Sequence, residues 1–190
     1  TGVVTAVEIL NIDCTRLTIE GNLNGVLVGD DLENITRYPE VYFCHNRVEY
    51  NRARGILLGS CKKTVISNNY FNTAGAAILF ESNGDFWFES GAVEDVVIEN
   101  NEFENCKYGA WCSAVIEVAP RKKTEENRYF HGNISVRNNR FHNCKFPLFK
   151  ANNVRLPAFE NNKIEPESLE KATLLEHCKQ AIITNLQAKN

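Results

Sequence analysis

A short motif with paired asparagines returns along this 190-residue chain at a nearly constant spacing. The three clearest copies are VISNNYF at 65–71, VIENNEF at 97–103 and SVRNNRF at 135–141. Weaker copies are FENNKI at 159–164, YFCHNRV at 42–48, IEGNLN at 19–24 and IITNLQ at 182–187. The second asparagine of each pair, here called the marker, falls at positions 22, 46, 69, 101, 139, 162 and 186. The spacings of 24, 23, 32, 38, 23 and 24 residues define a period of 23 or 24, with two enlarged repeats.

Apolar side chains keep a fixed register relative to the marker. The residue three positions before it is apolar in every copy, as Ile66 and Ile98 illustrate, and the residue two positions after it is apolar in every copy except the first. Short β-type runs with a polar residue at a fixed turn are typical of a parallel β-helix, whose coils stack ~4.8 Å apart. In such a stack the asparagines hydrogen-bond to their counterparts in neighbouring coils. A leucine-rich repeat would need an LxxLxLxxN pattern, and a helical solenoid a 3.6-residue period, and neither is present.

We therefore predict an all-β chain in which residues 1–190 form a single parallel β-helix segment of about seven coils. Because the chain begins at Thr1 and contains no methionine, we expect it to be a piece or a processed product of a longer protein. The segment EPESLEKATLLEHC at 165–178 could be taken for an amphipathic helix. Its match to the repeat around Cys61 predicts a strand in its second half.

Composition argues against several classes of function. The 21 basic and 24 acidic residues give a net charge of -3, without the basic excess expected of a nucleic-acid-binding domain. No apolar run approaches the ~20 residues of a membrane-spanning helix. The seven cysteines are odd in number and lack metal-site spacing, so we expect small buried apolar residues. They are Cys14, Cys44, Cys61, Cys106, Cys112, Cys144 and Cys178.

The two enlarged repeats are neighbours, and in each the extra residues follow an apolar strand. AAILF at 76–80 leads into a loop at about 81–93, and SAVIEV at 113–118 leads into a loop at about 119–132. Loops that leave successive coils after equivalent strands emerge on the same side. The run Phe86, Trp87, Phe88, Glu89 should therefore lie close to Arg121, Lys122 and Lys123. Aromatic faces beside charged groups, on loops of a rigid scaffold, suit carbohydrate binding; alternatively, the aromatics cover an open edge of the core.

Several polar residues near these loops are candidates for a site. Among the carboxylates Glu81, Asp85, Glu89 and Glu117, equivalent positions one or two coils apart would be separated by ~5 or ~10 Å. These values bracket the separations of retaining and inverting glycosidases, and no single pair is favoured. Arg52 and Arg54, in NRARGILL, suit either bidentate ligand binding or a salt bridge to Glu81. His131 and His142 have no partners at catalytic spacing, so we expect them on the surface.

Five blocks resemble glycoside hydrolase family 110, the bacterial α-galactosidases that cleave terminal α-1,3-linked galactose. They are DDLENITRYPEV, NRARGILL, NNYFNTAGAAILFE, FWFESGAVEDVVIENNEFENC and the following YGAW, which together span about residues 30–143. The resemblance implies a right-handed parallel β-helix, inverting hydrolysis without a cofactor or metal, and a secreted or periplasmic bacterial protein. Members of this family are several hundred residues long, so this chain resembles the later coils of their catalytic solenoid.

The resemblance also suggests which residues form a sugar pocket. Glu89 and Glu81 are the catalytic candidates, although the acid and base can also lie in upstream coils. The substrate-binding candidates are Trp87 as a stacking platform, Arg52, Arg54, Ser90 and Glu117. The expected partner is an oligosaccharide or polysaccharide with terminal galactose, and homo-oligomer formation is left open. The alternatives are a polysaccharide lyase, for which the chain lacks a calcium-binding Asp cluster, and a non-catalytic carbohydrate-binding or structural β-helix module.

Overall fold

The computed structural model describes the chain except for residues 85, 88–90, 122–127, 166–170, 185–186 and 189–190. The chain divides into two compact units, Thr1–Leu32 and Glu33–Asn190. The first unit contains an antiparallel hairpin of β1 (Gly2–Ile9) and β2 (Thr15–Gly21).

This hairpin differs from the prediction that the copy around Asn22 forms a coil like the others. Ile19 lies in β2 and pairs antiparallel with Val4. The side chain of Asn22 accepts a hydrogen bond from the Asn24 N–H (2.9 Å), within its own turn. The first copy is thus satisfied by local hairpin and turn contacts, which its resemblance to the motif did not distinguish from stacking.

The second unit contains two parallel sheets and one short 3-10 helix, η1 (Ile35–Arg37). The ten-stranded sheet has the order β3 (Glu40–Cys44), β6 (Cys61–Ser67), β9 (Val93–Glu99), β12 (His131–Arg137), β14 (Phe149–Glu160), β11 (Ile116–Val118), β8 (Ile78–Phe80) and β5 (Ile56–Leu58), with β16 (Thr173–Cys178) and β17 (Ile182–Thr184) both paired to β14. The six-stranded sheet has the order β18 (Gln187–Ala188), β15 (Lys163–Ile164), β13 (Arg140–His142), β10 (Glu102–Glu104), β7 (Tyr70–Thr73) and β4 (Arg47–Asn51).

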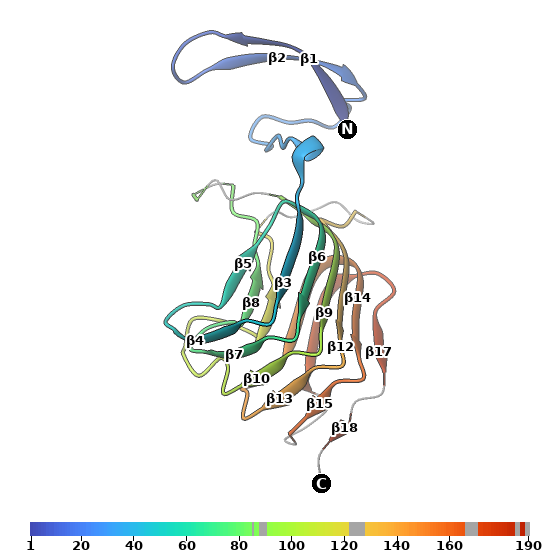
Figure 1. The fold of residues 1–190 in the computed structure, drawn as a ribbon. Coiled ribbons are helices and arrows are strands. Elements are labelled where there is room, and N and C mark those ends of the chain that lie inside the picture. The colour runs from blue at the N-terminus through green and yellow to red at the C-terminus, as the bar shows by residue number, and fades with distance from the viewer. Residues whose placement is uncertain (85, 88–90, 122–127, 166–170, 185–186, 189–190) are drawn as a thin grey trace. The chain divides into compact units, whose positions relative to one another are not determined.

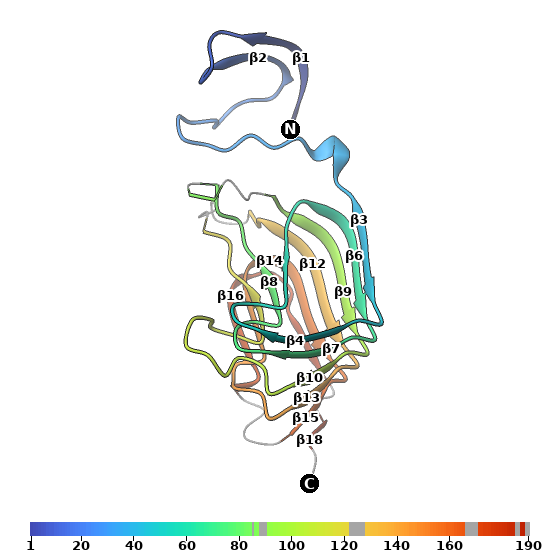
Figure 2. The same ribbon diagram turned by 60° about the vertical axis from the view of Figure 1, so that its left-hand side comes forward.

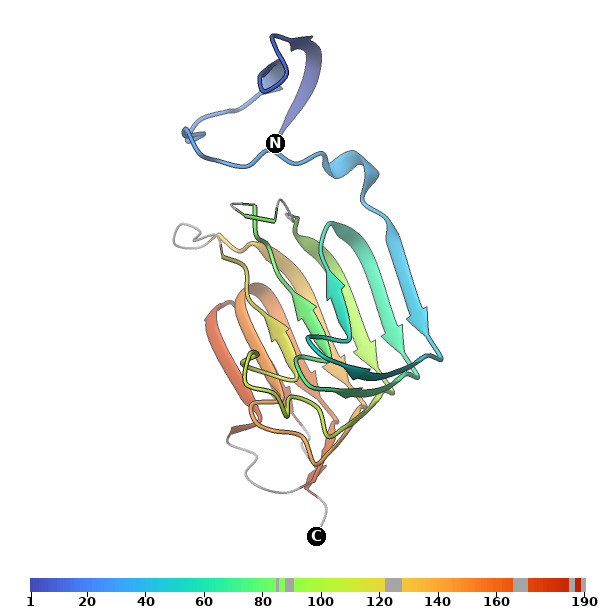
Figure 3. The same ribbon diagram turned by 90° about the vertical axis from the view of Figure 1, so that its left-hand side faces the viewer.

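The large sheet curls, whereas the six short strands lie side by side in sequence order (Figures 1 and 2). Figure 3 shows strands of the two arms of the large sheet, such as β6 and β8, at different places around this unit. The all-β class is confirmed, and so is the strand predicted for the second half of 165–178, which is β16.

The marker asparagines form a continuous ladder where the two sheets meet. In each step, the backbone N–H and the side-chain amide of one marker both donate to the Oδ1 atom of the next. The N···Oδ1 distances from the backbone are 2.8 Å for Asn46 to Asn69, 2.9 Å for Asn69 to Asn101, 2.9 Å for Asn101 to Asn139 and 2.9 Å for Asn139 to Asn162. The preceding residues, His45, Asn68, Asn100, Asn138 and Asn161, have φ between 53° and 60°. Asparagine tolerates this left-handed conformation better than most residues, so the NN pair provides both the bend and the ladder.

The core between the sheets is built from the register positions predicted to be apolar. Two residues after each marker, the rings of Phe71, Phe103 and Phe141 stack with centroid separations of 5.2 and 4.8 Å. Three residues before the markers, Ile66 and Ile98 are fully buried beside them. Burial of these side chains is the main force that holds the strands together.

The cysteines follow the predicted role only in part. All seven are free; Cys61 and Cys106 are buried, Cys14 is exposed and the others are intermediate. The Cys106 thiol donates to the Phe71 carbonyl, and the Cys144 thiol donates to the Phe103 carbonyl, both at 3.3 Å. These two thiols therefore bond to backbone groups of neighbouring repeats. Cys14, in the hairpin turn, does not fit the prediction of burial.

Within the described residues, no helix has the length and apolar character needed to cross a membrane.

Candidate functional site

The two loops of the enlarged repeats begin side by side, as predicted. After β8 and β11, the Ala119 N–H donates to the Phe80 carbonyl (2.9 Å) and the Arg121 N–H donates to the Ser82 carbonyl (3.1 Å). The Arg121 guanidinium forms an ion pair with Glu81, with 3.3 Å between Nε and Oε1. This ion pair fixes Glu81 at the start of the first loop. Lys122 and Lys123 lie outside the described residues.

The described part of the aromatic run is on the surface. The Phe86 and Trp87 residues are 67% and 61% exposed, so they do not cover the core. Their rings meet edge to face, with centroids 4.7 Å apart. Asp85, Phe88, Glu89 and Ser90 lie outside the described residues.

Glu117 lies on the outer face of the short strands. Its neighbours along β11, Ile116 and Val118, are fully buried, so the Glu117 side chain points away from the core. The parallel register places it beside Leu79 of β8 and Lys150 of β14. The Ser113 backbone N–H donates to Glu117 Oε2 (2.9 Å), and the Ser113 hydroxyl donates to Oε1. These two hydrogen bonds hold the carboxylate in a defined orientation.

Glu81 lies on the same outer face as Glu117. It is two residues beyond Leu79, the direct partner of Glu117, and side chains two positions apart on a strand share a face. A strand spacing of ~4.8 Å and an advance of ~6.6 Å over two residues place the two Cα atoms about 8 Å apart. Carboxylates on such positions can reach the ~6.5–9.5 Å separation that an inverting glycosidase needs to admit a water molecule.

Arg52 and Arg54 are exposed in the turn between β4 and β5. The ion pair found for Glu81 is with Arg121, so the structure does not support the alternative in which these arginines bind Glu81. Their charges are therefore carried at the surface, beside the edge of the outer face.

Trp111 is a site candidate that the sequence analysis did not single out. The residue is 59% exposed, and its indole N–H donates to the Ala53 carbonyl (3.3 Å), between the two arginines. A Cβ atom on Gly109 would lie 3.0 Å from the ring, and one on Gly75 would lie 3.0 Å from its Nε1. The YGAW block contained the tryptophan, but no signal in the sequence connected it to Ala53, 58 residues away.

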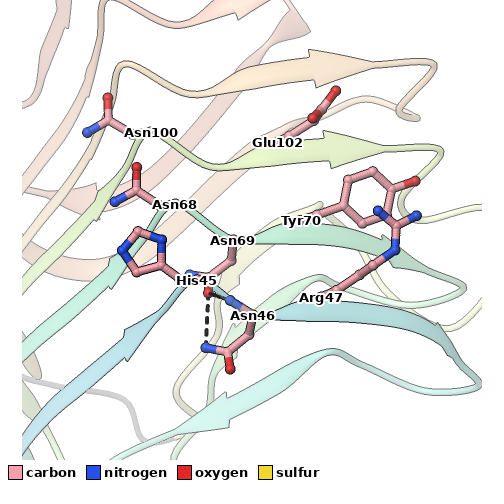
Figure 4. A pocket seen from close by; sticks show the side chains of 8 residues that line it. All are labelled: His45, Asn46, Arg47, Asn68, Asn69, Tyr70, Asn100 and Glu102. Atoms are coloured by element: carbon pink, nitrogen blue, oxygen red, sulfur yellow. Dashed lines mark hydrogen bonds between the residues drawn. The ribbon is translucent and has the colours of Figure 1, made fainter.

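A hollow of about 450 Å³ lies at the bend that carries the asparagine ladder (Figure 4). Its lining residues are His45, Asn46, Arg47, Asn68, Asn69, Tyr70, Asn100 and Glu102. Arg47 forms a bidentate ion pair with Glu49 and lies 3.9 Å over the Tyr70 ring. The Tyr70 hydroxyl donates to Glu104 (2.6 Å), and this hydrogen bond raises the pKa of the phenol. The polar groups that line the hollow are thus largely engaged with one another, as expected of a structural corner.

The prediction that His131 is a surface residue is wrong. This residue is 1% exposed, because it begins β12 on the side facing the core, and burial lowers its pKa to about 3. Its Nδ1 atom accepts a hydrogen bond from the Val93 N–H (3.3 Å). It also lines a second hollow, of about 500 Å³, together with Tyr129, Phe130 and Arg155.

His142 is also less exposed than expected. Its side chain is 18% exposed, with Nδ1 2.8 Å from Glu165 and Nε2 3.7 Å from Glu102. In the part of the chain that the structure describes, no group of three or more His, Cys, Asp or Glu side chains is arranged to hold a metal ion.

Comparison with known proteins gives a consistent result. No family model matches the chain. The α-1,3-galactosidase B of Bacteroides thetaiotaomicron is 36% identical over 172 residues, which cover 85% of this chain and 28% of that protein. The α-1,3-galactosidase B of Bacteroides fragilis is 38% identical over 72% of this chain and 24% of its own length. The α-1,3-galactosidase A of Shewanella woodyi is 42% identical over 57% of this chain and 18% of its own length.

The chain is a relative of the bacterial α-1,3-galactosidases. The resemblance predicted from the five sequence blocks is therefore confirmed. The matched region corresponds to about a quarter of the length of the B-type α-1,3-galactosidases. Within this α-1,3-galactosidase-like chain, the structure brings Glu81 and Glu117 to one face, and Arg121 with them.

Proposed function

We propose that this chain belongs to a protein that hydrolyses terminal α-1,3-linked galactose with inversion, and that it supplies later coils of a right-handed parallel β-helix. The observation that carries the proposal is the 36% identity to an α-1,3-galactosidase over 85% of this chain. The parallel strand register and the asparagine ladder support the β-helix, with one repeat as one coil. A secreted or periplasmic location and action without a cofactor belong to the same proposal.

The outer face offers the groups that such a reaction needs. In an inverting glycosidase, one carboxylic acid protonates the leaving oxygen while a carboxylate removes a proton from the attacking water on the opposite face of the sugar. Glu81 is our candidate for the carboxylate, because Arg121 holds it at the edge of the face. We propose Glu89 from the same loop as its partner, or a residue from an upstream coil.

The remaining candidates are proposed to bind the sugar. Glu117 is oriented by Ser113 to accept hydrogen bonds from sugar hydroxyls, and Arg52 and Arg54 are exposed at the border of the face. Trp87, with most of its surface exposed, offers a ring for stacking. Ser90 keeps the binding role that the sequence resemblance implies.

The direct test measures galactose release from α-1,3-galactobiose by the protein and by Glu81→Gln and Glu89→Gln variants. We expect each of these neutral isosteres to lower kcat by roughly 10²–10⁴-fold, as is usual for loss of a general acid or base. Glu20→Gln, an exposed carboxylate on the hairpin strand β2, is the matched control and should keep full activity.

The outcome also separates the alternatives. Release that survives both substitutions would remove Glu81 and Glu89 from the mechanism. Galactoside binding without release, by a protein whose circular dichroism shows it folded, would favour a carbohydrate-binding module. Calcium-dependent formation of an unsaturated product would instead indicate a polysaccharide lyase.

A further inference from the structure

The indole of Trp111 is held in place from several directions. Its N–H donates to the Ala53 carbonyl at 3.3 Å, from a residue 58 positions away in sequence. The absence of side chains on Gly75 and Gly109 leaves room for the ring, because a Cβ on either would approach it to 3.0 Å. The ring is thus packed on backbone although the residue is 59% exposed.

The loop that carries Trp111 is also anchored at both ends. The Gly109 N–H donates to the Ala74 carbonyl (2.7 Å), and the Lys107 ammonium donates to the Phe146 carbonyl (2.8 Å). The Lys145 ammonium donates to the Tyr108 carbonyl (3.1 Å). A ring held in this way loses little conformational freedom when a ligand binds, which favours affinity.

Polar groups surround this ring on the side of the outer face. Ser113, two residues after Trp111 and so within about 7 Å along the chain, donates to the Glu117 carboxylate. The carbonyl that accepts the indole N–H belongs to Ala53, and exposed arginines at 52 and 54 flank it. The site therefore combines an exposed apolar ring with a fixed acceptor and two cationic donors.

We propose that Trp111 is a stacking platform for a pyranose ring of the galactoside, whose hydroxyls bond to Glu117 and to the arginines of the β4–β5 turn. A pyranose has an apolar face of C–H groups and a rim of hydroxyls, which matches this combination of groups. The inference rests on the proposed function for its ligand. It adds a second aromatic contact, on an anchored loop, to the one proposed for Trp87.

The chain contains only two tryptophans, so fluorescence can report on each ring separately. In a Trp87→Phe variant the emission comes from Trp111 alone, and in a Trp111→Phe variant it comes from Trp87 alone. We expect titration with α-1,3-galactobiose to give a saturable change in the emission of the Trp87→Phe protein. Maltose, which lacks galactose, is the ligand control.

Affinity is then measured by calorimetry in Trp111→Ala and Trp111→Phe. We expect Trp111→Ala to weaken α-1,3-galactobiose binding about three- to tenfold, the range of an aromatic contact, and Trp111→Phe to weaken it less. Tyr42→Ala is the matched control, because this residue is 60% exposed on β3 and its loss should leave affinity unchanged. If Trp111→Ala fails to fold, the Phe variant and the fluorescence titration decide the question.

Two results would overturn the platform: unchanged affinity in the Trp111 variants, or no emission change from Trp111 at saturating galactobiose. Neither result affects galactose release by the unaltered protein, so the proposed function would stand. Failure of the proposed function would appear separately, as the absence of release from that protein.

Discussion

At the scale of single residues, the marker asparagine has the most demanding environment. Asn101 is 1% exposed, and its Oδ1 accepts from both the backbone and the side chain of Asn69. Its own amide donates to the Ile66 carbonyl (2.9 Å) and to Asn139 (3.0 Å). Buried polar groups with satisfied hydrogen bonds stabilise the fold, but they become costly when one partner is removed.

We therefore predict that Asn101→Ala lowers the free energy of unfolding by roughly 2–4 kcal/mol, because it leaves donors of Asn69 buried without an acceptor. Urea denaturation followed by circular dichroism measures the change. Asn46→Ala is the matched control at the exposed end of the ladder, and we expect a cost below about 1 kcal/mol. Equal losses in the two variants would contradict the ladder as a buried network.

The repeated asparagines made these contacts predictable, since a fixed residue at a fixed period must meet its counterpart when repeats stack. The position of Arg121 beside Glu81 followed from the same register. Trp111 could not be found this way. Its seat depends on Gly75, Gly109 and the Ala53 carbonyl, which lie at no repeated position relative to the markers.

At the scale of strands, aromatic stacking joins successive members of the six-stranded sheet. Phe71 of β7, Phe103 of β10 and Phe141 of β13 are directly paired in the parallel register. Their interplanar angles are 9° and 10°, so each ring lies flat on the next. The middle ring has neighbours on both sides, and its removal would leave a cavity at two strand pairs.

Phe103→Ala should accordingly cost about 3–5 kcal/mol in the free energy of unfolding, the usual range for a buried phenylalanine. The same substitution at Phe86, which is 67% exposed, should change stability by no more than about 0.5 kcal/mol. Thermal and urea denaturation of the two variants test this. Comparable destabilisation by both would mean that the ring stack contributes little.

The first unit shows where strand prediction from the repeat was insufficient. GVVTAVEI and TRLTIEG carry apolar and polar residues that suit either an outer coil or a hairpin. The antiparallel pairing of β1 with β2 is set by contacts within this unit, across the turn at 10–14. A weak copy of the motif at Asn22 did not reveal that choice.

At the scale of the whole molecule, the buried His131 couples stability to pH. Its pKa in the folded protein is about 3, below the ordinary value of 6.5, because burial disfavours the charged ring. The unfolded chain thus binds a proton at this histidine before the folded protein does. Stability from this group is complete above pH 6.5 and is lost as the pH falls toward about 3.

We predict that His131→Gln reduces the acid dependence of the unfolding free energy between pH 6 and 4, by up to about 1.4 kcal/mol per pH unit. The slope, rather than the stability at a single pH, is the quantity compared with that of the unaltered protein. His45→Asn alters an exposed histidine and should leave the slope unchanged. An unchanged slope in His131→Gln would mean that this ring is already protonated in the fold over that range.

The ladder has a consequence for how such a molecule can evolve. Steps that bridge 23, 32 and 38 residues of sequence end in nearly the same hydrogen bond, 2.8 to 2.9 Å long. The geometry of the scaffold is thus independent of how much chain is looped out between two markers. Mutation can lengthen, shorten or rewrite the loops at 81–93 and 119–132 without disturbing the core beneath them. Selection for a new glycan can therefore act on the rim of this molecule while its interior stays the same.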